Sequence, residues 1–164
     1  MKKSYKAALS GIFLALSAGL SAAESLLPLP MGVKPGFSNL PILIAMWEIS
    51  PAIGFSICIM RSVSVFLMRG FTAFVISLSG GLLSYAVMLI LYKKTRRSYV
   101  FISAAGGAAH NTGQMLAAML IMKSTAIVYY IFILVISGLV SGVITGYTAK
   151  LIIPKLEPFL RRKK

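Results

Sequence analysis

The sequence contains no aspartate, only three acidic residues in all, a single histidine and a single cysteine. Without aspartate, neither an Asp-rich magnesium site nor a Ser-His-Asp triad can form. One histidine and one cysteine are too few for a zinc site, and Cys58 alone excludes a disulfide within the chain. The GxxxxGK[ST] loop that cradles nucleotide phosphates is also absent. We therefore expect a protein that is not an enzyme by itself and does not hydrolyse ATP.

Charge is scarce as well. Of the 164 residues, 58% are hydrophobic and 12% are charged, with a mean hydropathy of +0.88. A soluble domain uses about a quarter charged residues, so this composition indicates a chain that folds in lipid. One membrane-spanning helix needs about 20 apolar residues, so the length permits at most about six spans. The sequence predicts an all-α integral membrane protein with one transmembrane domain over residues 1–164.

Prolines, glycines and charges divide the chain into six apolar segments. The predicted spans are residues 7–27, 39–47, 51–68, 71–92, 99–122 and 126–153. The second is too short to cross a bilayer alone, so we expect it to tilt or to pack beside a cavity. The first has an alternative interpretation as a signal peptide cleaved after the small residues Ser21, Ala22 and Ala23.

Seventeen lysines and arginines give a net charge of +14. In a soluble protein this charge would suggest nucleic acid. Here most cations flank apolar segments, at the start of the chain, at 93–97 and from Lys150 onward. Such clusters are typical of cytoplasmic loops and attract anionic lipid headgroups. Six spans place both termini and residues 93–97 in the cytoplasm, whereas merging 39–68 into one span would place 93–97 outside. We expect a multi-pass protein of the cell membrane without a nucleic-acid partner.

Small residues at every fourth position let helices approach closely in lipid. In the last segment, Gly138, Gly142 and Gly146 predict packing within the protein. The first segment carries a longer series, either for internal packing or for docking another membrane protein. The residues of this series are Ala7, Gly11, Ala15, Gly19 and Ala23.

Polar residues inside apolar segments mark sites or pathways. His110 and Gln114 lie one helical turn apart, with Asn111 adjacent. They suit either a polar ligand or a hydrogen-bond cluster between helices. Arg61 lies near the middle of the third segment, where a buried guanidinium needs a partner. The candidates are Glu24, Glu48 or an anionic ligand. Under the six-span topology, Glu24 is the expected protein partner if the site opens outward.

Four segments together resemble a known family. They read AESLLPLPMGVKPGFSNLP, IMRSVSVFLMRG, SLSGGLLSYAVM and GGAAHNTGQMLAAML. The chain resembles the Gx transporter family, also called heptaprenyl diphosphate synthase component I, over almost its whole length, most specifically at His110 to Gln114. That family is similar to the S components of energy-coupling factor (ECF) transporters, which bind substrate and work with a transmembrane T component and ATPases.

The resemblance implies an S-component-like six-helix bundle. The small-residue series of the first segment would dock onto the T component, and residues 28–38 would cap an outward-facing pocket. The candidate pocket residues are Glu24, Lys34, Asn39, Arg61, His110, Asn111 and Gln114. The substrate would be a small metabolite, anionic or related to isoprenoids. The alternatives are a noncatalytic anchor for a prenyl diphosphate synthase and a solitary secondary transporter, against which the scarcity of acids counts.

Overall fold

The computed structural model describes residues 3–26, 36–95, 98–123 and 129–161. Its elements are α1 (Lys3–Leu26), the short 3₁₀ helix η2 (Phe37–Asn39), α2 (Leu40–Glu48), α3 (Pro51–Thr95), α4 (Tyr99–Met122) and α5 (Ile131–Arg161). Every regular element in these ranges is a helix, which confirms the all-α class. Proline stands in the first turn of α2 and begins α3, where its missing N–H has no helical partner.

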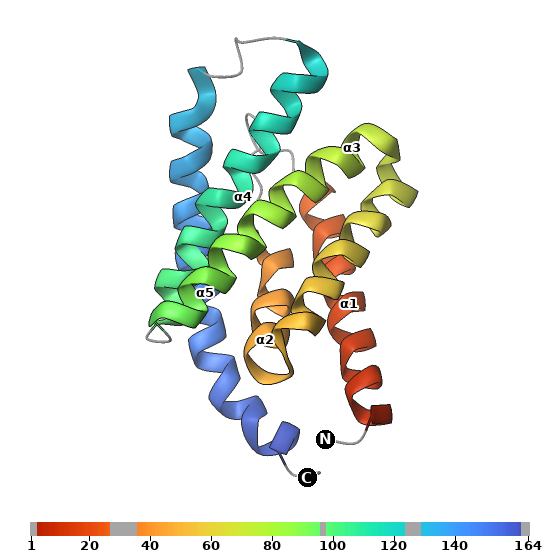
Figure 1. The fold of residues 1–164 in the computed structure, drawn as a ribbon, viewed down its shortest axis with the longest axis vertical. Coiled ribbons are helices and arrows are strands. Elements are labelled where there is room, and N and C mark those ends of the chain that lie inside the picture. Colours follow the sequence, from red (N-terminus) through yellow and green to blue (C-terminus); the bar gives the residue numbers. More distant parts are fainter. Residues whose placement is uncertain (1–2, 27–35, 96–97, 124–128, 162–164) are drawn as a thin grey trace.

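The described chain has five α-helices, not the predicted six, because residues 51–68 and 71–92 belong to one bent element. Gly70 lies inside α3 with φ 82° and ψ −178°, which are not helical angles. Only glycine adopts this combination of φ and ψ readily. The non-helical backbone at Gly70 reverses the chain, so α3 has two arms. Figure 1 shows them side by side, joined at the bend.

The chain reverses at alternate ends of the molecule. In Figure 1 the start of α1, the α2–α3 turn, the adjoining ends of α3 and α4, and the end of α5 lie towards one end. The end of α1, the bend in α3 and the adjoining ends of α4 and α5 lie towards the other. Counting both arms of α3, this order of turns agrees with six consecutive passes.

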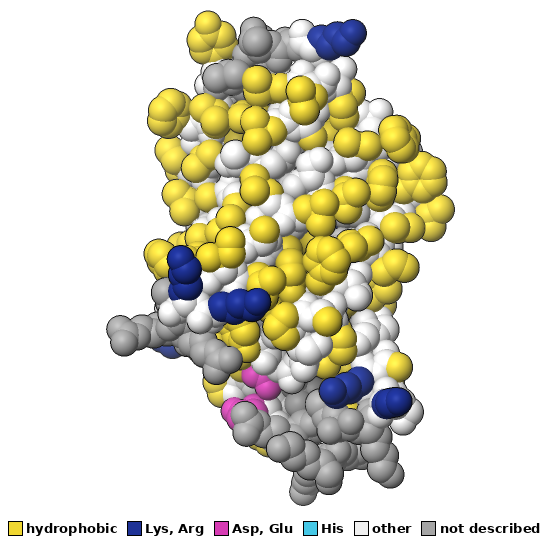
Figure 2. Space-filling model, viewed as in Figure 1, with side chains coloured by type: hydrophobic (Ala, Val, Ile, Leu, Met, Phe, Trp, Pro, Cys, Tyr) yellow, Lys and Arg dark blue, Asp and Glu magenta, His cyan; other side chains and the backbone are white. Residues whose placement is uncertain are grey.

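Among the described residues, three helical segments are long and apolar enough to cross a membrane: Lys3–Leu26, Pro51–Lys94 and Ile131–Pro158. The polar residues His110, Asn111 and Gln114 interrupt α4, which is not one of the three. Figure 2 shows apolar side chains across the middle and upper part of one face. Lysine and arginine side chains lie mainly in its lower half.

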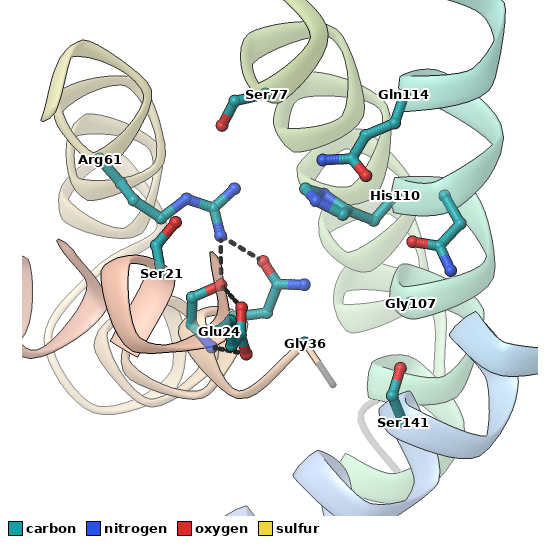
Figure 3. A pocket seen from close by; sticks show the side chains of 12 residues that line it. Ser21, Glu24, Gly36, Arg61, Ser77, Gly107, His110, Gln114 and Ser141 are labelled. Atoms are coloured by element: carbon teal, nitrogen blue, oxygen red, sulfur yellow. Dashed lines mark hydrogen bonds between the residues drawn. The ribbon is translucent and has the colours of Figure 1, made fainter. Parts of the chain in front are cut away.

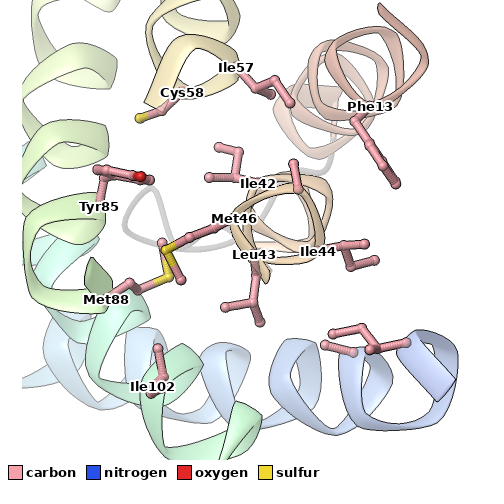
Figure 4. Packing of buried hydrophobic residues seen from close by; sticks show 13 residues of the cluster. Phe13, Ile42, Leu43, Ile44, Met46, Ile57, Cys58, Tyr85, Met88 and Ile102 are labelled. Carbon is pink, nitrogen blue, oxygen red and sulfur yellow. The ribbon is translucent and has the colours of Figure 1, made fainter. Parts of the chain in front are cut away.

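The short helix α2 forms the centre of the core. All six residues from Pro41 to Met46 are buried. Figure 4 shows Ile42, Leu43 and Met46 surrounded by side chains of α1, α3 and α4. A helix of nine residues is thus enclosed by longer helices, which explains why it needs neither the length nor the exposed apolar surface of a lipid-facing span.

Helices α4 and α5 pack backbone to backbone, as the glycines of the last segment predicted. A Cβ atom added to Gly142 would lie 2.4 Å from the carbonyl oxygen of Ser103. One added to Gly138 would lie 2.5 Å from the carbonyl oxygen of Gly107. Such distances leave no room for a side chain, so these glycines set the separation of the two helices.

Candidate functional site

A polar cavity lies among five helical elements in the upper half of the bundle. The space without atoms in and around it amounts to about 390 Å³, which includes open solvent at its mouth. About 20 Å³ is available to the centre of a water molecule. Its lining comes from every α-helix except α2: Ser21, Glu24, Gly36, Ser38, Asn39, Arg61, Ser77, Gly107, His110, Asn111, Gln114 and Ser141. In this form the cavity has room for about one water molecule.

Arg61 dominates the electrostatics of the cavity. Its side chain is 1% exposed, and Nη1 donates hydrogen bonds to Asn39 Oδ1 at 2.7 Å and Ser38 Oγ at 3.2 Å. Its other nitrogens, Nε and Nη2, are buried and have no hydrogen-bond partner among the described residues. A buried guanidinium has five N–H donors, so part of its capacity is unused.

Glu24 is held by Ser38 on the other side of the same network. The Ser38 backbone N–H donates to Glu24 Oε1 at 3.1 Å, and its hydroxyl donates to Oε2 at 3.0 Å. Because Arg61 Nη1 donates to the same hydroxyl, Glu24 and Arg61 are linked through Ser38. The predicted pairing of Arg61 with Glu24 thus takes an indirect form. Ser17 Oγ of α1 fixes the turn further, by donating to the Ser38 carbonyl at 2.7 Å.

The turn that carries Ser38 and Asn39 depends on a glycine. Gly36 has φ 73°, a left-handed conformation that most side chains avoid. Its carbonyl accepts the backbone N–H of Asn39 at 3.0 Å, which starts η2. This turn brings the Ser38 hydroxyl and the Asn39 side chain within hydrogen-bonding distance of Arg61.

Helix α4 forms the wall of the cavity that faces Arg61. In Figure 3 the side chains of His110 and Gln114 point from α4 towards Arg61 across the cavity. Asn111 lines the same cavity, but its side-chain amide forms hydrogen bonds with two residues of α5. It donates to the Leu134 carbonyl at 2.7 Å and to Ser137 Oγ at 3.2 Å. Of the two interpretations for this segment, Asn111 follows the interhelical one, whereas His110 and Gln114 face the cavity.

The other predicted residues are distributed unevenly. Glu24, Asn39 and Arg61 meet in the cavity, while Lys34 lies outside the described residues, as does most of the predicted cap at 28–38. Glu48, at the end of α2, does not line the cavity. Six small lining residues were not among the predicted pocket residues: Ser21, Gly36, Ser38, Ser77, Gly107 and Ser141. Gly36 and Ser38 belong to the predicted cap at 28–38, and only proximity in sequence to predicted residues could have indicated the others.

A second, smaller cavity adjoins the first. About 10 Å³ of it is available to the centre of a water molecule, compared with about 20 Å³ in the first. The two share Gly36, Asn39, Gly107 and Ser141. The hydroxyls of Ser84 and Thr145 line the smaller one, and both are buried without a hydrogen-bond partner among the described residues. Unused polar capacity therefore extends from Arg61 into the centre of the bundle.

The series Ala7, Gly11, Ala15, Gly19 and Ala23, which we call the α1 stripe, lies on the outside. All five of its residues are exposed, and Cβ atoms added to Gly11 or Gly19 would meet nothing within 4 Å. The buried residues of this helix, Phe13, Ser17 and Glu24, lie on another face. The stripe therefore takes no part in packing within the described chain.

These features define a helical membrane protein with a polar cavity enclosed in an apolar bundle. The family model for heptaprenyl diphosphate synthase component I matches residues 13–152. The chain belongs to this family. No curated protein and no solved structure matches it.

Proposed function

We propose that this protein is the substrate-binding membrane component of an ECF-type uptake transporter. The observation that carries the proposal is Arg61, a fully buried guanidinium with unused donors in a cavity lined by polar residues of four α-helices and η2. Polar groups at such depth are expensive and are typical of substrate sites. The lining residues Ser21 and Glu24 belong to the end of α1, and Ser77 follows the bend in α3, so the cavity lies nearer the end of the bundle that the six-span topology assigns to the outside.

The α1 stripe supports a partner subunit in the membrane. A lipid-facing helix gains nothing from small residues, whereas a helix that docks another helix needs them for close approach. The stripe is exposed over its whole length and is flanked by the exposed side chains of Ile12 and Leu16. It offers a T component a surface of small residues beside an apolar ridge. ATPase subunits would then supply the energy that this chain lacks the motifs to provide.

The orientation of the proposal follows from charge. Lys3, Lys93, Lys94 and Lys150 are exposed and Lys6 is half-buried, and all five belong to helix segments at the end of the bundle that holds both chain termini. Positively charged ends face the cytoplasm, so both termini would lie inside the cell and the cavity would be reached from outside.

A second candidate is a noncatalytic membrane subunit that anchors a prenyl diphosphate synthase. The description of the matched family favours it. In that case the basic cytoplasmic end would bind the soluble enzyme, and neither the cavity nor the α1 stripe would be needed.

Affinity purification from native membranes in mild detergent, with mass spectrometry of the recovered proteins, distinguishes these functions. The variants are Ala15→Leu in the stripe and, as a matched control, Ala86→Leu, which makes the same change at an exposed position of α3. We expect a T component and ATPases to accompany the wild type and the Ala86→Leu control, and to be lost from Ala15→Leu. Recovery of a prenyl synthase without them would support the anchor, and recovery of neither would refute both.

A further inference from the structure

The unused part of Arg61 has a defined shape. Nη1 carries both hydrogen bonds to η2, which leaves Nε and Nη2. In a guanidinium, Nε–H and one N–H of Nη2 point in parallel from one edge of the plane. This edge forms two parallel hydrogen bonds with a carboxylate or phosphate, a geometry that a lysine cannot reproduce.

A glycine packs close to this edge, where a side chain would crowd Nη2. A Cβ atom added to Gly81 would lie 3.3 Å from Arg61 Nη2 and 2.9 Å from Cys58 Sγ. One turn before it, Ser77 lines the cavity, and Figure 3 shows its side chain on the same side of Arg61 as the unused edge. His110 and Gln114 approach from the opposite wall. A group bound here would thus meet further hydrogen-bonding side chains.

The chemistry of the unused groups restricts the ligand. Nε–H and Nη2–H are donors only, so the group that satisfies them must be an acceptor. Glu24, whose two oxygens accept from Ser38, lies on the side of the bonded Nη1. As it stands the cavity has room for about one water molecule, so a bound head group would have to widen it, and the rest of a ligand would extend beyond it.

We propose that Arg61 binds an oxoanion, a carboxylate or phosphate group of the substrate, through its Nε and Nη2 edge, with Ser77, His110 and Gln114 around it. The proposal rests on the function proposed above and names the chemical class of its substrate. Arg61 is then a binding residue. Its Nη1 atom is fixed by hydrogen bonds to η2, and its Nε and Nη2 edge selects two acceptor oxygens at fixed spacing.

The test uses the purified full chain and three probes: acetate, inorganic phosphate and inorganic diphosphate, each compared with chloride at equal ionic strength. Thermal unfolding is followed by the fluorescence of Trp47, the one tryptophan in the sequence. A bound ligand raises the unfolding temperature in a saturable manner. We expect at least one probe to do so, with roughly ten- to hundredfold weaker affinity for Arg61→Lys, because one charge-assisted hydrogen bond is lost.

Arg69→Lys is the matched control, since Arg69 is exposed and belongs to the same helix. It should bind as the wild type does. Gly81→Ala is the second variant, for the case that Arg61→Lys does not fold, and should weaken binding by crowding Nη2. The proposal is overturned if no probe gives a saturable rise, or if Arg61→Lys and Gly81→Ala both bind like the wild type.

Failure of this inference is separable from failure of the proposed function. Binding of the probes needs no partner subunit, whereas the purification experiment needs no ligand. Recovery of the ATPases without oxoanion binding would leave a transporter for another class of substrate. Binding without the ATPases would leave an oxoanion site in a protein of a different function.

Discussion

The two glycine series make opposite predictions for the same substitution. Gly142→Ala and Gly19→Ala each add one methyl group to a helix of a membrane protein. At Gly142 the new Cβ atom would lie 2.4 Å from the Ser103 carbonyl oxygen and 2.6 Å from the Ala104 Cα atom. At Gly19 it would meet nothing within 4 Å. The pair thus separates the effect of packing from that of helix propensity.

The magnitude follows from the distances. Ordinary contact begins at 3.4 Å, so α4 and α5 must separate by about 3.4 − 2.4 = 1.0 Å at Gly142. The obstructing atoms are backbone, which cannot rotate away as a side chain can. Overpacking of this kind costs about 1–3 kcal/mol. Alanine is a better helix former than glycine by up to about 1 kcal/mol, and this gain applies at both positions. We therefore expect Gly142→Ala to be about 1–3 kcal/mol less stable than Gly19→Ala.

Equilibrium unfolding in mild detergent, followed by circular dichroism and Trp47 fluorescence, measures both variants against the wild type. Gly19→Ala should equal or exceed the wild type in free energy of unfolding, and Gly142→Ala should fall below Gly19→Ala. Equal stabilities of the two variants would refute the close packing of α4 on α5. A marked loss for Gly19→Ala would instead show that the α1 stripe packs inside the protein.

Three further predictions use the same assay. Thr145→Val removes a buried hydroxyl that has no partner among the described residues, so the free energy of unfolding should stay level or rise by about 1 kcal/mol; a clear loss would mean that the hydroxyl is bonded. Gly70→Ala should lower it by about 1–3 kcal/mol through backbone strain alone, because the site is open and φ is 82°; no loss would mean that the bend does not need this conformation. Glu24→Gln and Arg61→Gln should each destabilise the protein, and the double variant should lose less than their sum, with a coupling of about 0.5–3 kcal/mol; additive losses would contradict the link through Ser38.

Much of the fold could be predicted because lipid imposes a strict pattern on sequence. The predicted segment 39–47 corresponds to α2 at Leu40–Glu48, and 99–122 has the bounds of α4. The predicted gap between 68 and 71 contains Gly70, where the two arms of α3 meet. The last predicted span ends at residue 153, whereas the helix α5 continues to Arg161, because apolar character ends before the helix does. A helix that leaves the membrane needs no apolar residues, and Pro154 and Pro158 did not stop it.

The direction in which each small-residue face points could not be predicted. The α1 stripe and the glycines of α5 have the same four-residue spacing, yet one is exposed and the other is in backbone contact with α4. Spacing tells which residues share a face of a helix, and it does not tell what that face meets. The opposite face of α1 carries Phe13, Ser17 and Glu24, so the buried residues of the helix, rather than the stripe itself, decide its orientation.

The candidate site contains residues that could be predicted, because burying them is costly, and residues that could not, because burying them costs little. Arg61 and Glu24 could be identified because a charge in an apolar segment requires a reason. Ser38 could not, since a lone serine in a loop is unremarkable in any sequence. In the structure Ser38 nonetheless joins the two charges: its N–H and hydroxyl satisfy Glu24, and its oxygen accepts from Arg61. Arg61 and Glu24 are linked through Ser38 and not by a direct ion pair. Because the hydrogen bonds to Ser38 and Asn39 occupy only Nη1, the Nε and Nη2 edge of Arg61 stays available.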